Sequence, residues 1–391
     1  MRRPLHKDID PQLSPSPDSH KGLWYERFFD QYDDNDWRII KEDPKQHISD
    51  GKKTWIQTVT GNKCGDKAAI EAAITRQYKL CIALGGEICV MQADWHFATG
   101  LGNPHPVENG FAWHPTLGVP YLTGAAVKGL VRAWIEEWEE EQDGKEEKLH
   151  RWFGSEDKDP TKCKLDSQSG NFIFFDALPI APVTLKMDVI TPHMGKWYDK
   201  GGEPPKPDGS NVPADWHSPV PVFFLVADKP QLLFAVASRV DVDKEETKTE
   251  LAKIMEVLNN ALEWLGAGAK TAVGYGHMTE DPERLKTLED KMNEETRQIA
   301  EEEAVKQMTP FEKELHILIK ANCDSNQKDY VILLKALESE KWTDTDTKNL
   351  VAQKIKGLMK IDKVWQETSK AKKPERDWDY QRTLKVLKYL N

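Results

Sequence analysis

Short apolar runs alternate with longer periodic stretches between residues 80 and 279. Runs of about four to eight apolar or alternating residues predict strands, whereas apolar positions three and four apart predict helices. The predicted strands are residues 81–97 (with a break at Gly85-Gly86), 172–177, 183–190, 220–227, 232–240 and 272–278. The predicted helices are residues 124–142 and 244–265. This zone therefore mixes strands with helices.

The order of these elements is strand, helix, several strands, helix, strand, which is the order of the ferredoxin-like, or split βαβ, unit. The sheet of such a unit is antiparallel, with helices on one face and the other face available to a ligand. The zone has two predicted strands more than the four strands of the minimal unit. We expect these two strands to flank residues 186–218, which are rich in proline and glycine. The pattern predicts an α+β, ferredoxin-like (RRM-like) core over residues 81–279 that carries this insertion.

The zones on either side have different patterns. Residues 1–80 mix polar, proline-containing and aromatic stretches, with one predicted helix at 67–77. Residues 280–391 are rich in Lys and Glu, contain little glycine and repeat apolar residues with a helical period. We therefore predict an N-terminal extension, a core and an all-helical C-terminal module that docks onto other proteins, divided near residues 80 and 280.

The charge balance limits how the chain can bind nucleic acid. Its 391 residues include 54 Lys and Arg and 65 Asp and Glu, which gives a formal net charge of −11. Nucleic-acid binding draws on counterion release and needs a surplus of basic side chains at the contact. The composition excludes a free-standing nucleic-acid coat protein and predicts weak RNA binding by the isolated chain, but it allows a local basic groove.

Several other classes are excluded by the residue pattern. No apolar run approaches the roughly 20 residues that a membrane-spanning helix needs. The five cysteines include no Cys-x-x-Cys pair, which argues against a zinc ribbon or a disulfide framework. We expect a reduced, cytoplasmic protein with no membrane contact, no metal site and no cofactor.

A glycine-rich loop lies between the second predicted helix and the last predicted strand. Its marked residues are Gly266, Gly268, Lys270, Thr271, Gly274 and Gly276. Glycine permits positive φ and close backbone approach, and successive N–H groups in such a turn can cradle a phosphate. Lys270 would add a positive charge and Thr271 a hydroxyl. The alternative is a helix cap followed by a tight turn, which explains one glycine but not four.

A second segment opens the first predicted helix. Gly124 begins a run of three small residues, and Lys128 and Arg132 follow it. Unpaired N–H groups at a helix start favour an anion, and residues four apart share a helix face. We predict that Gly124, Lys128 and Arg132 contact phosphate and that this segment and the glycine-rich loop face one polyanion. The alternative is an ordinary amphipathic helix with two solvated cations.

At these residues the chain resembles the RAMP superfamily of CRISPR-associated RNA-binding proteins. The likeness rests on two strings: G-x-G-x5-G-x-G from Gly266 to Gly276, and Pro-Tyr-Leu-x-Gly-x-x-x-Lys-Gly-x-x-Arg from Pro120 to Arg132. Residues 100–103 and 265–271 look most like those of a subunit of type III-B Cmr effector complexes. The resemblance covers about residues 80–279.

The resemblance implies a scaffold subunit that binds guide RNA (crRNA) near its 3′ end and packs against the other Cmr subunits, especially the backbone RAMP subunits. It also implies a projecting β-hairpin, the thumb, which separates the bases of guide and target RNA. Residues 186–218 are the candidate thumb. Trp197, Tyr198 and Trp216 are its candidates for base stacking, because aromatic planes hold single-stranded bases apart. A surface loop or an interface with a neighbouring subunit is the alternative.

The related backbone subunits cut target RNA with an aspartate in the loop after the first strand. The corresponding loop here, residues 98–121, contains no aspartate, so the resemblance implies no target cleavage and we expect no catalytic residue. The rival hypothesis is a metal-independent RAMP endoribonuclease that processes precursor guide RNA, with His105 or His114 as general acid or base. A third hypothesis is a protein-docking module whose glycine-rich loop only packs.

Overall fold

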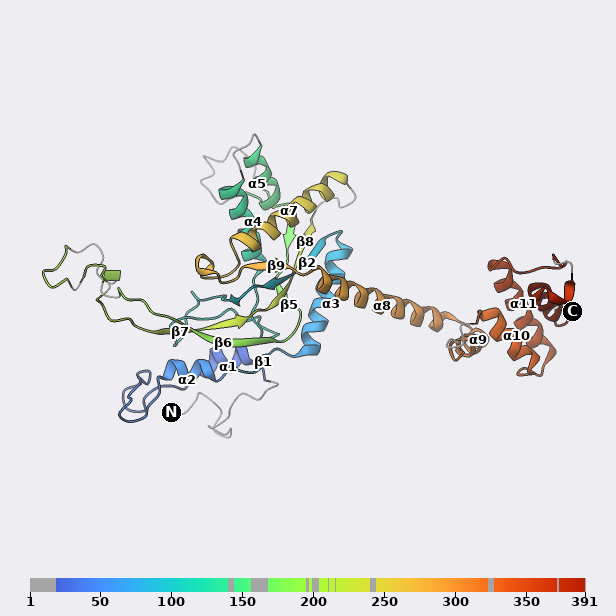
Figure 1. Cartoon of the computed structure of the whole chain (residues 1–391), viewed down its shortest axis with the longest axis horizontal. Helices are drawn as coiled ribbons and strands as arrows, with labels where there is room; N and C mark the ends of the chain where they lie inside the picture. Colours follow the sequence, from blue (N-terminus) through green and yellow to red (C-terminus); the bar gives the residue numbers. More distant parts are fainter. Residues whose placement is uncertain are drawn as a thin grey trace. The chain divides into compact units, whose positions relative to one another are not determined.

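The computed structural model describes residues 19–139, 144–155, 168–194, 197–198, 204–209, 211–214, 216–239, 244–322, 327–370 and 373–390. The chain forms two compact units, residues 1–290 and 291–391, each with an apolar core of its own. The first unit combines helices with antiparallel sheets, and the described part of the second is helical (Figure 1). The predicted α+β class is confirmed, whereas the division near residues 80 and 280 stays a prediction.

The first sheet of the first unit is antiparallel. Its strands are, in spatial order, β4 (Phe172–Phe174), β8 (Gln231–Ser238), β2 (Glu87–Ala93) and β9 (Met278–Glu280), and β5 (Leu178–Pro179) also pairs with β8. Helices α4 (Gly124–Trp138) and α7 (Glu245–Trp264) pack on this sheet and on each other. Each helix buries an apolar stripe, centred on Val131 in α4 and Leu258 in α7, as the 3.6-residue period predicts.

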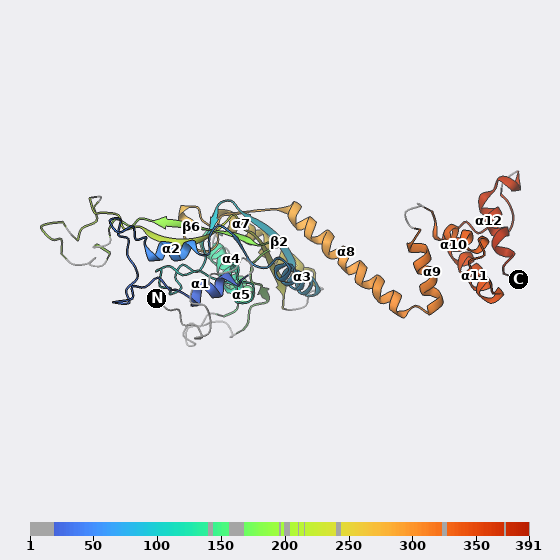
Figure 2. The ribbon, with the colours of Figure 1, turned by 90° about the horizontal axis from the view of Figure 1, so that it is seen from below.

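The second sheet contains the two extra strands. Its order is β1 (Lys63–Cys64), β6 (Val183–Ile190), β7 (Val222–Asp228) and β3 (His96–Phe97). Strands β6 and β7 form a hairpin whose register runs from Leu185 opposite Ala227 to Ile190 opposite Val222. Figures 1 and 2 both show the described residues between β6 and β7 lying beyond the end of this hairpin, away from the rest of the first unit.

The N-terminal extension shares the core of the first unit. Its helices are α1 (Lys21–Arg27), α2 (Gly51–Gln57) and α3 (Lys67–Ala83). The fully buried rings of Tyr25 and Trp55 stack on each other. Buried Lys21 donates hydrogen bonds from Nζ to the carbonyl oxygens of Asn62 and Lys63, at 3.0 and 3.1 Å. These contacts tie α1 to the edge strand β1.

Two predicted strands have different boundaries in the structure. Residues 81–83 complete α3, and strand β2 begins only at Glu87. The turn between them needs glycine, because a Cβ on Gly86 would lie 2.6 Å from the carbonyl oxygen of Val236. The predicted strand 272–278 is instead a 3₁₀ turn, η1 (Thr271–Val273), followed by β9. Positive φ values in the glycine-rich loop exclude an extended strand there.

Residues 280–391 carry the helices α8 (Pro282–Gln307), α9 (Pro310–Lys320), α10 (Asp329–Glu338), α11 (Thr345–Ile361) and α12 (Trp378–Leu387), and the 3₁₀ turn η3 (Pro374–Arg376). Helix α9 begins with a capping box in which the Thr309 hydroxyl and the Glu312 carboxylate bond each other's backbone N–H. Leu333 of α10 and Ile355 of α11 lie in the core of the second unit. The described part of this zone is therefore helical, as the period of its apolar residues predicts.

Candidate nucleic-acid interface

The glycine-rich loop is shaped by backbone packing. Its four glycines have positive φ: Gly266 73°, Gly268 88°, Gly274 95° and Gly276 70°. A Cβ on Gly268 would lie 2.2 Å from the carbonyl oxygen of Ala98, and a Cβ on Gly276 would lie 1.9 Å from that of Ala267. Both positions therefore require glycine for structural reasons, whatever the loop binds.

Hydrogen bonds within the chain occupy much of the loop backbone. The N–H groups that donate to backbone carbonyls are those of Ala267, Ala269, Val273, Gly274, Tyr275 and Gly276. In the described structure, the N–H groups of Gly268 and of residues 270–272 have no hydrogen-bond partner. Phosphate binding through the backbone is therefore restricted to this short stretch.

Lys270 lies at the centre of that stretch with φ 62°. Its Nζ lies 5.6 Å from the centre of the Phe224 ring, which belongs to the hairpin strand β7. The ammonium group has no carboxylate partner among the described residues. Lys270 is therefore available to an external anion beside the base of the hairpin.

The start of α4 differs from the prediction, because the chain supplies its own anion. The carboxylate of Asp176 accepts a hydrogen bond from the Gly124 N–H at 2.7 Å, and the Thr123 hydroxyl caps the Ala126 N–H at 3.2 Å. A Cβ on Gly124 would lie 2.1 Å from the carbonyl oxygen of Phe174, so this glycine is required by packing. An RNA contact through the N–H group of Gly124 or Ala126 would therefore have to displace these bonds.

The two segments are neighbours. A cavity of about 390 Å³ is lined by Leu122, Ala126 and Leu130 on one side and by Gly266, Gly268 and Thr271 on the other. A larger cavity of about 580 Å³ adjoins it and shares Leu122, Ala126 and Gly268. The structure thus brings the start of α4 and the glycine-rich loop together, although they are more than 130 residues apart in sequence.

The basic side chains of the two segments have different surroundings. Ala126 faces the shared cavity, and Lys128 lies two residues further on, about 200° around the helix axis. Burial and then repulsion from Arg239 and Arg132 lower the pKa of Lys128. Arg132 also pairs with Glu136 at 2.7 Å. Lys128 and Lys270 therefore belong to two different segments, and the expectation that both segments face one polyanion stays a prediction.

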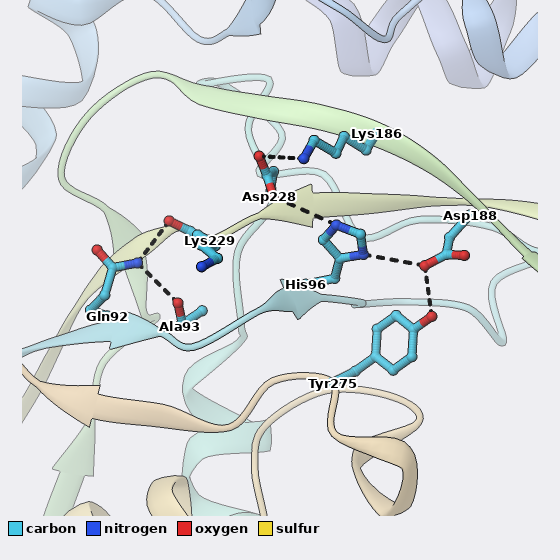
Figure 3. Close-up of polar contacts among 8 residues, drawn as sticks. All are labelled: Gln92, Ala93, His96, Lys186, Asp188, Asp228, Lys229 and Tyr275. Atoms are coloured by element: carbon cyan, nitrogen blue, oxygen red, sulfur yellow. Dashed lines mark hydrogen bonds and ion pairs between the residues drawn. The ribbon is translucent and has the colours of Figure 1, made fainter.

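A polar cluster at the base of the hairpin was not predicted from the sequence (Figure 3). His96 Nδ1 lies 3.2 Å from Asp188 Oδ2, and His96 Nε2 lies 3.5 Å from Asp228 Oδ1. The Tyr275 hydroxyl donates to the same Asp188 oxygen at 2.7 Å, and Lys186 Nζ lies 2.9 Å from Asp228 Oδ2. The cluster links β3, both hairpin strands and the glycine-rich loop.

Hydrogen bonds in this cluster stabilise the charged form of Asp188. Burial raises the pKa of Asp188, but hydrogen bonds from Tyr275, the Val189 N–H and His96 outweigh it, so the pKa lies below its ordinary value. Burial and the neighbouring carboxylate of Asp188 raise the pKa of Tyr275. No local pattern marks these residues, since Asp188 lies 92 positions from His96 and 87 from Tyr275.

The two histidines considered for catalysis are held by structural contacts. His105 Nε2 donates to the carbonyl oxygen of Tyr25 at 3.0 Å, and its Nδ1 accepts from the Val107 N–H at 3.2 Å. His114 Nδ1 accepts from the Leu117 N–H at 3.2 Å. Burial lowers the pKa of both histidines. These bonds use both nitrogens of His105 and one nitrogen of His114.

The aromatic side chains proposed for base stacking lie between β6 and β7. The exposed fractions are 36% for Trp197, 66% for Tyr198 and 72% for Trp216. The rings of Trp197 and Tyr198 lie 5.3 Å apart. All three rings are accessible to a partner.

Within the described parts of the chain, no group of three His, Cys, Asp or Glu side chains is arranged to hold a metal ion. In the same parts, no helix is both long and apolar enough to cross a lipid bilayer.

Residues 92–279 match the family model of the RAMP superfamily. The resemblance predicted from the sequence is therefore confirmed over this segment, which contains the glycine-rich loop, α4 and the hairpin. Among curated proteins, the chain is 29% identical to "CRISPR system Cmr subunit Cmr6" of Pyrococcus furiosus, over 46% of this chain and 64% of that protein. It is also 29% identical to Cmr6 of Saccharolobus solfataricus, over 43% of this chain and 47% of that protein.

The chain spans less than two thirds of the length of these relatives. Among solved structures, it is similar to a chain of the type III-B Cmr-beta complex bound to cognate target RNA, with 20% identity and a TM-score of 0.43 over 59% of this chain and 71% of that one. It is also similar to the crystal structure of Cmr6 from Pyrococcus furiosus, with 26% identity and a TM-score of 0.28 over 50% of this chain and 98% of that one.

Proposed function

We propose that this chain is a non-catalytic, RNA-binding scaffold subunit of a type III-B CRISPR (Cmr) ribonucleoprotein in antiviral defence. It holds the guide-RNA backbone near the 3′ end and packs against backbone RAMP subunits. The observation that carries the proposal is the match of residues 92–279 to the RAMP superfamily, supported by the similarity to two proteins named Cmr6.

Two basic contacts support the RNA-binding role. The first is Lys270 with the unoccupied N–H groups beside it in the glycine-rich loop. The second is the group formed by Lys128, Arg132 and Arg239, in which like charges lie close together and lower the pKa of Lys128 after the effect of burial. Such a group gains favourable energy when an anion binds. Contacts of this kind reach phosphates and are largely independent of base sequence.

The architecture supports the same role. The sheet order β4-β8-β2-β9, with α4 after β2 and α7 after β8, is what a ferredoxin-like core would have. We assign the β6–β7 hairpin, with residues 186–218, as the thumb that separates guide from target bases. Its exposed Trp197, Tyr198 and Trp216 are suited to stacking on bases.

The RNA grip is tested by charge reversal. We expect Lys128→Glu combined with Lys270→Glu to weaken binding of a single-stranded RNA and to reduce its salt slope by about 0.7 per lost phosphate contact. Fluorescence anisotropy at several salt concentrations measures both quantities. The control is Arg76→Glu with Lys79→Glu, an equal charge change on the exposed side of α3. Equal losses in both double variants would show that net charge alone decides binding.

The non-catalytic role is tested separately. We expect the purified chain to leave repeat-containing RNA intact in EDTA, because His105 is fully engaged in structural contacts and His114 partly so. Discrete products analysed by gel electrophoresis would favour the metal-independent endoribonuclease. If products form and the His105→Gln variant still cleaves the RNA, another histidine becomes the candidate for the general acid or base.

The assembly is tested by co-purification from the native host. We expect the tagged chain to recover other Cmr subunits and guide RNA. If the double lysine variant recovers the proteins but its crosslinking to guide RNA is unchanged, the chain is a protein-docking module whose glycine-rich loop only packs.

A further inference from the structure

The larger of the two adjoining cavities contains groups that phosphate binding does not use. It measures about 580 Å³ and lies between α1, the loop after β3, the start of α4 and the glycine-rich loop. Its polar and aromatic lining includes Glu26, Thr99, Asn103, Trp113 and Tyr121. Ligand sites in proteins are commonly concave, largely apolar and furnished with a few polar groups of this kind.

Several polar groups of this cavity lack strong partners. In the described structure, the carboxylate of Glu26 and the hydroxyl of Tyr121 form no hydrogen bond. The Asn103 side chain donates only a long bond of 3.5 Å to the carbonyl oxygen of Phe111. The Thr99 hydroxyl donates to the Tyr121 carbonyl at 3.0 Å, which leaves its lone pairs to accept. The cavity therefore offers both acceptors and donors to a polar guest.

The walls also suit a flat ring. Trp113 lies among aromatic side chains, with its ring centre 4.9 Å from that of Phe111, and Tyr121 forms a second aromatic wall. Gly100 and Gly268 also line the cavity. Proteins that recognise single-stranded RNA stack unpaired bases on aromatic side chains and bond their Watson–Crick edges.

The position of the cavity connects it to the proposed RNA path. It shares Gly268 with the smaller cavity, and the unoccupied N–H groups and Lys270 follow directly in the chain. A nucleotide whose phosphate contacts this stretch of the glycine-rich loop can therefore direct its base into the larger cavity.

We propose that this cavity binds one unstacked guanine of the RNA strand held by the glycine-rich loop. The carboxylate of Glu26 accepts hydrogen bonds from N1–H and the exocyclic amine, since these two adjacent donors match the two oxygens of a carboxylate. Uracil presents a single N–H between two carbonyl oxygens and is disfavoured. The inference rests on the proposed RNA binding, and it adds base selection by the N-terminal extension, which lies outside the segment that matches the RAMP superfamily.

The test compares two RNAs with the full-length chain: an oligouridine, and the same strand with one central guanosine. We expect the guanosine strand to bind at least about fivefold more tightly, the lower end of the discrimination that a paired base contact supplies. Glu26→Gln removes this preference and keeps binding of oligouridine. The control Glu42→Gln, at another exposed acid of the extension, keeps the preference. Equal affinity of the wild-type chain for both strands overturns the inference and leaves RNA binding intact, whereas no binding of either strand contradicts the proposed function itself.

A second measurement uses only the wild-type chain, so its result does not depend on whether a variant folds. The central guanosine is replaced by 6-thioguanosine and crosslinked by light to the wild-type chain. Adducts on peptides containing Trp113 or Tyr121 support the inference. Adducts only elsewhere in the chain overturn it.

Discussion

His105 has a structural role that its residue type does not reveal. Its ring stacks on Tyr25 with 4.3 Å between ring centres, and its two nitrogens bond the Tyr25 carbonyl and the Val107 N–H. The bond from Val107 needs an unprotonated Nδ1, so the folded state favours neutral imidazole, and burial lowers its pKa in the same direction. The histidine therefore ties the loop after β3 to α1.

This arrangement predicts a loss of stability in mild acid. As the pH falls through about 6.5, the unfolded chain binds a proton on His105 before the folded chain does, so the free energy of unfolding decreases. We expect His105→Gln to lower stability at pH 7 and to flatten its decline between pH 7 and 5. Urea unfolding at several pH values measures this slope. His193→Gln, at an exposed histidine, should leave the slope unchanged, and a slope that His105→Gln does not alter would contradict this account.

At the scale of elements, α4 contains two glycines with opposite roles. Gly124 is pressed against the backbone of Phe174, whereas a Cβ on Gly129 would meet no atom within 4 Å. The sequence pattern predicted that Gly124 contacts an anion. The structure gives a different reason for a glycine at this position, which is its close contact with the backbone of Phe174. The same applies to Gly276 in the glycine-rich loop, where the carbonyl oxygen of Ala267 leaves no space for a side chain.

The pair on α4 gives a matched prediction. We expect Gly129→Ala to raise the free energy of unfolding by about 0.5–1 kcal/mol, because alanine is the better helix former and the space is open. Gly124→Ala should lower it by about 1–3 kcal/mol, because the methyl group displaces backbone. Denaturant unfolding of both variants measures the difference. Similar effects of the two substitutions would show that the contact at Gly124 can relax.

At the scale of the whole molecule, the described residues of each unit form a main hydrophobic core of their own. Leu258 of α7 lies in the core of the first unit, and Leu333 of α10 lies in that of the second; both are fully buried. Each core packs its own helices, so each unit has its own source of stability.

We therefore expect two thermal transitions that respond to different substitutions. Leu258→Ala should destabilise the first unit by about 2–5 kcal/mol and Leu333→Ala the second unit by a similar amount. Differential scanning calorimetry should show each variant moving one transition and leaving the other in place. A single transition that both variants shift equally would mean that the two units unfold as one.

The amino-acid sequence alone predicted the α+β class, the boundaries of several elements and the helical C-terminal zone. These features depend on local periodicity, as in β6, where the predicted residues 183–190 match the strand. It also predicted the RAMP resemblance, because the glycine and lysine strings are contiguous. It missed the end of α3 and the turn at Thr271–Val273, where positive φ and close backbone contacts overrule residue propensity.

Only the tertiary structure decided which side chains meet. It placed the Asp176 carboxylate on the N–H of Gly124, brought the start of α4 beside the glycine-rich loop, and gathered His96, Asp188 and Tyr275 at the base of the hairpin. The physical reason is that periodicity assigns a residue to a face of its own element. The partner opposite that face comes from packing between segments distant in the chain, and a single sequence carries no local signal for it.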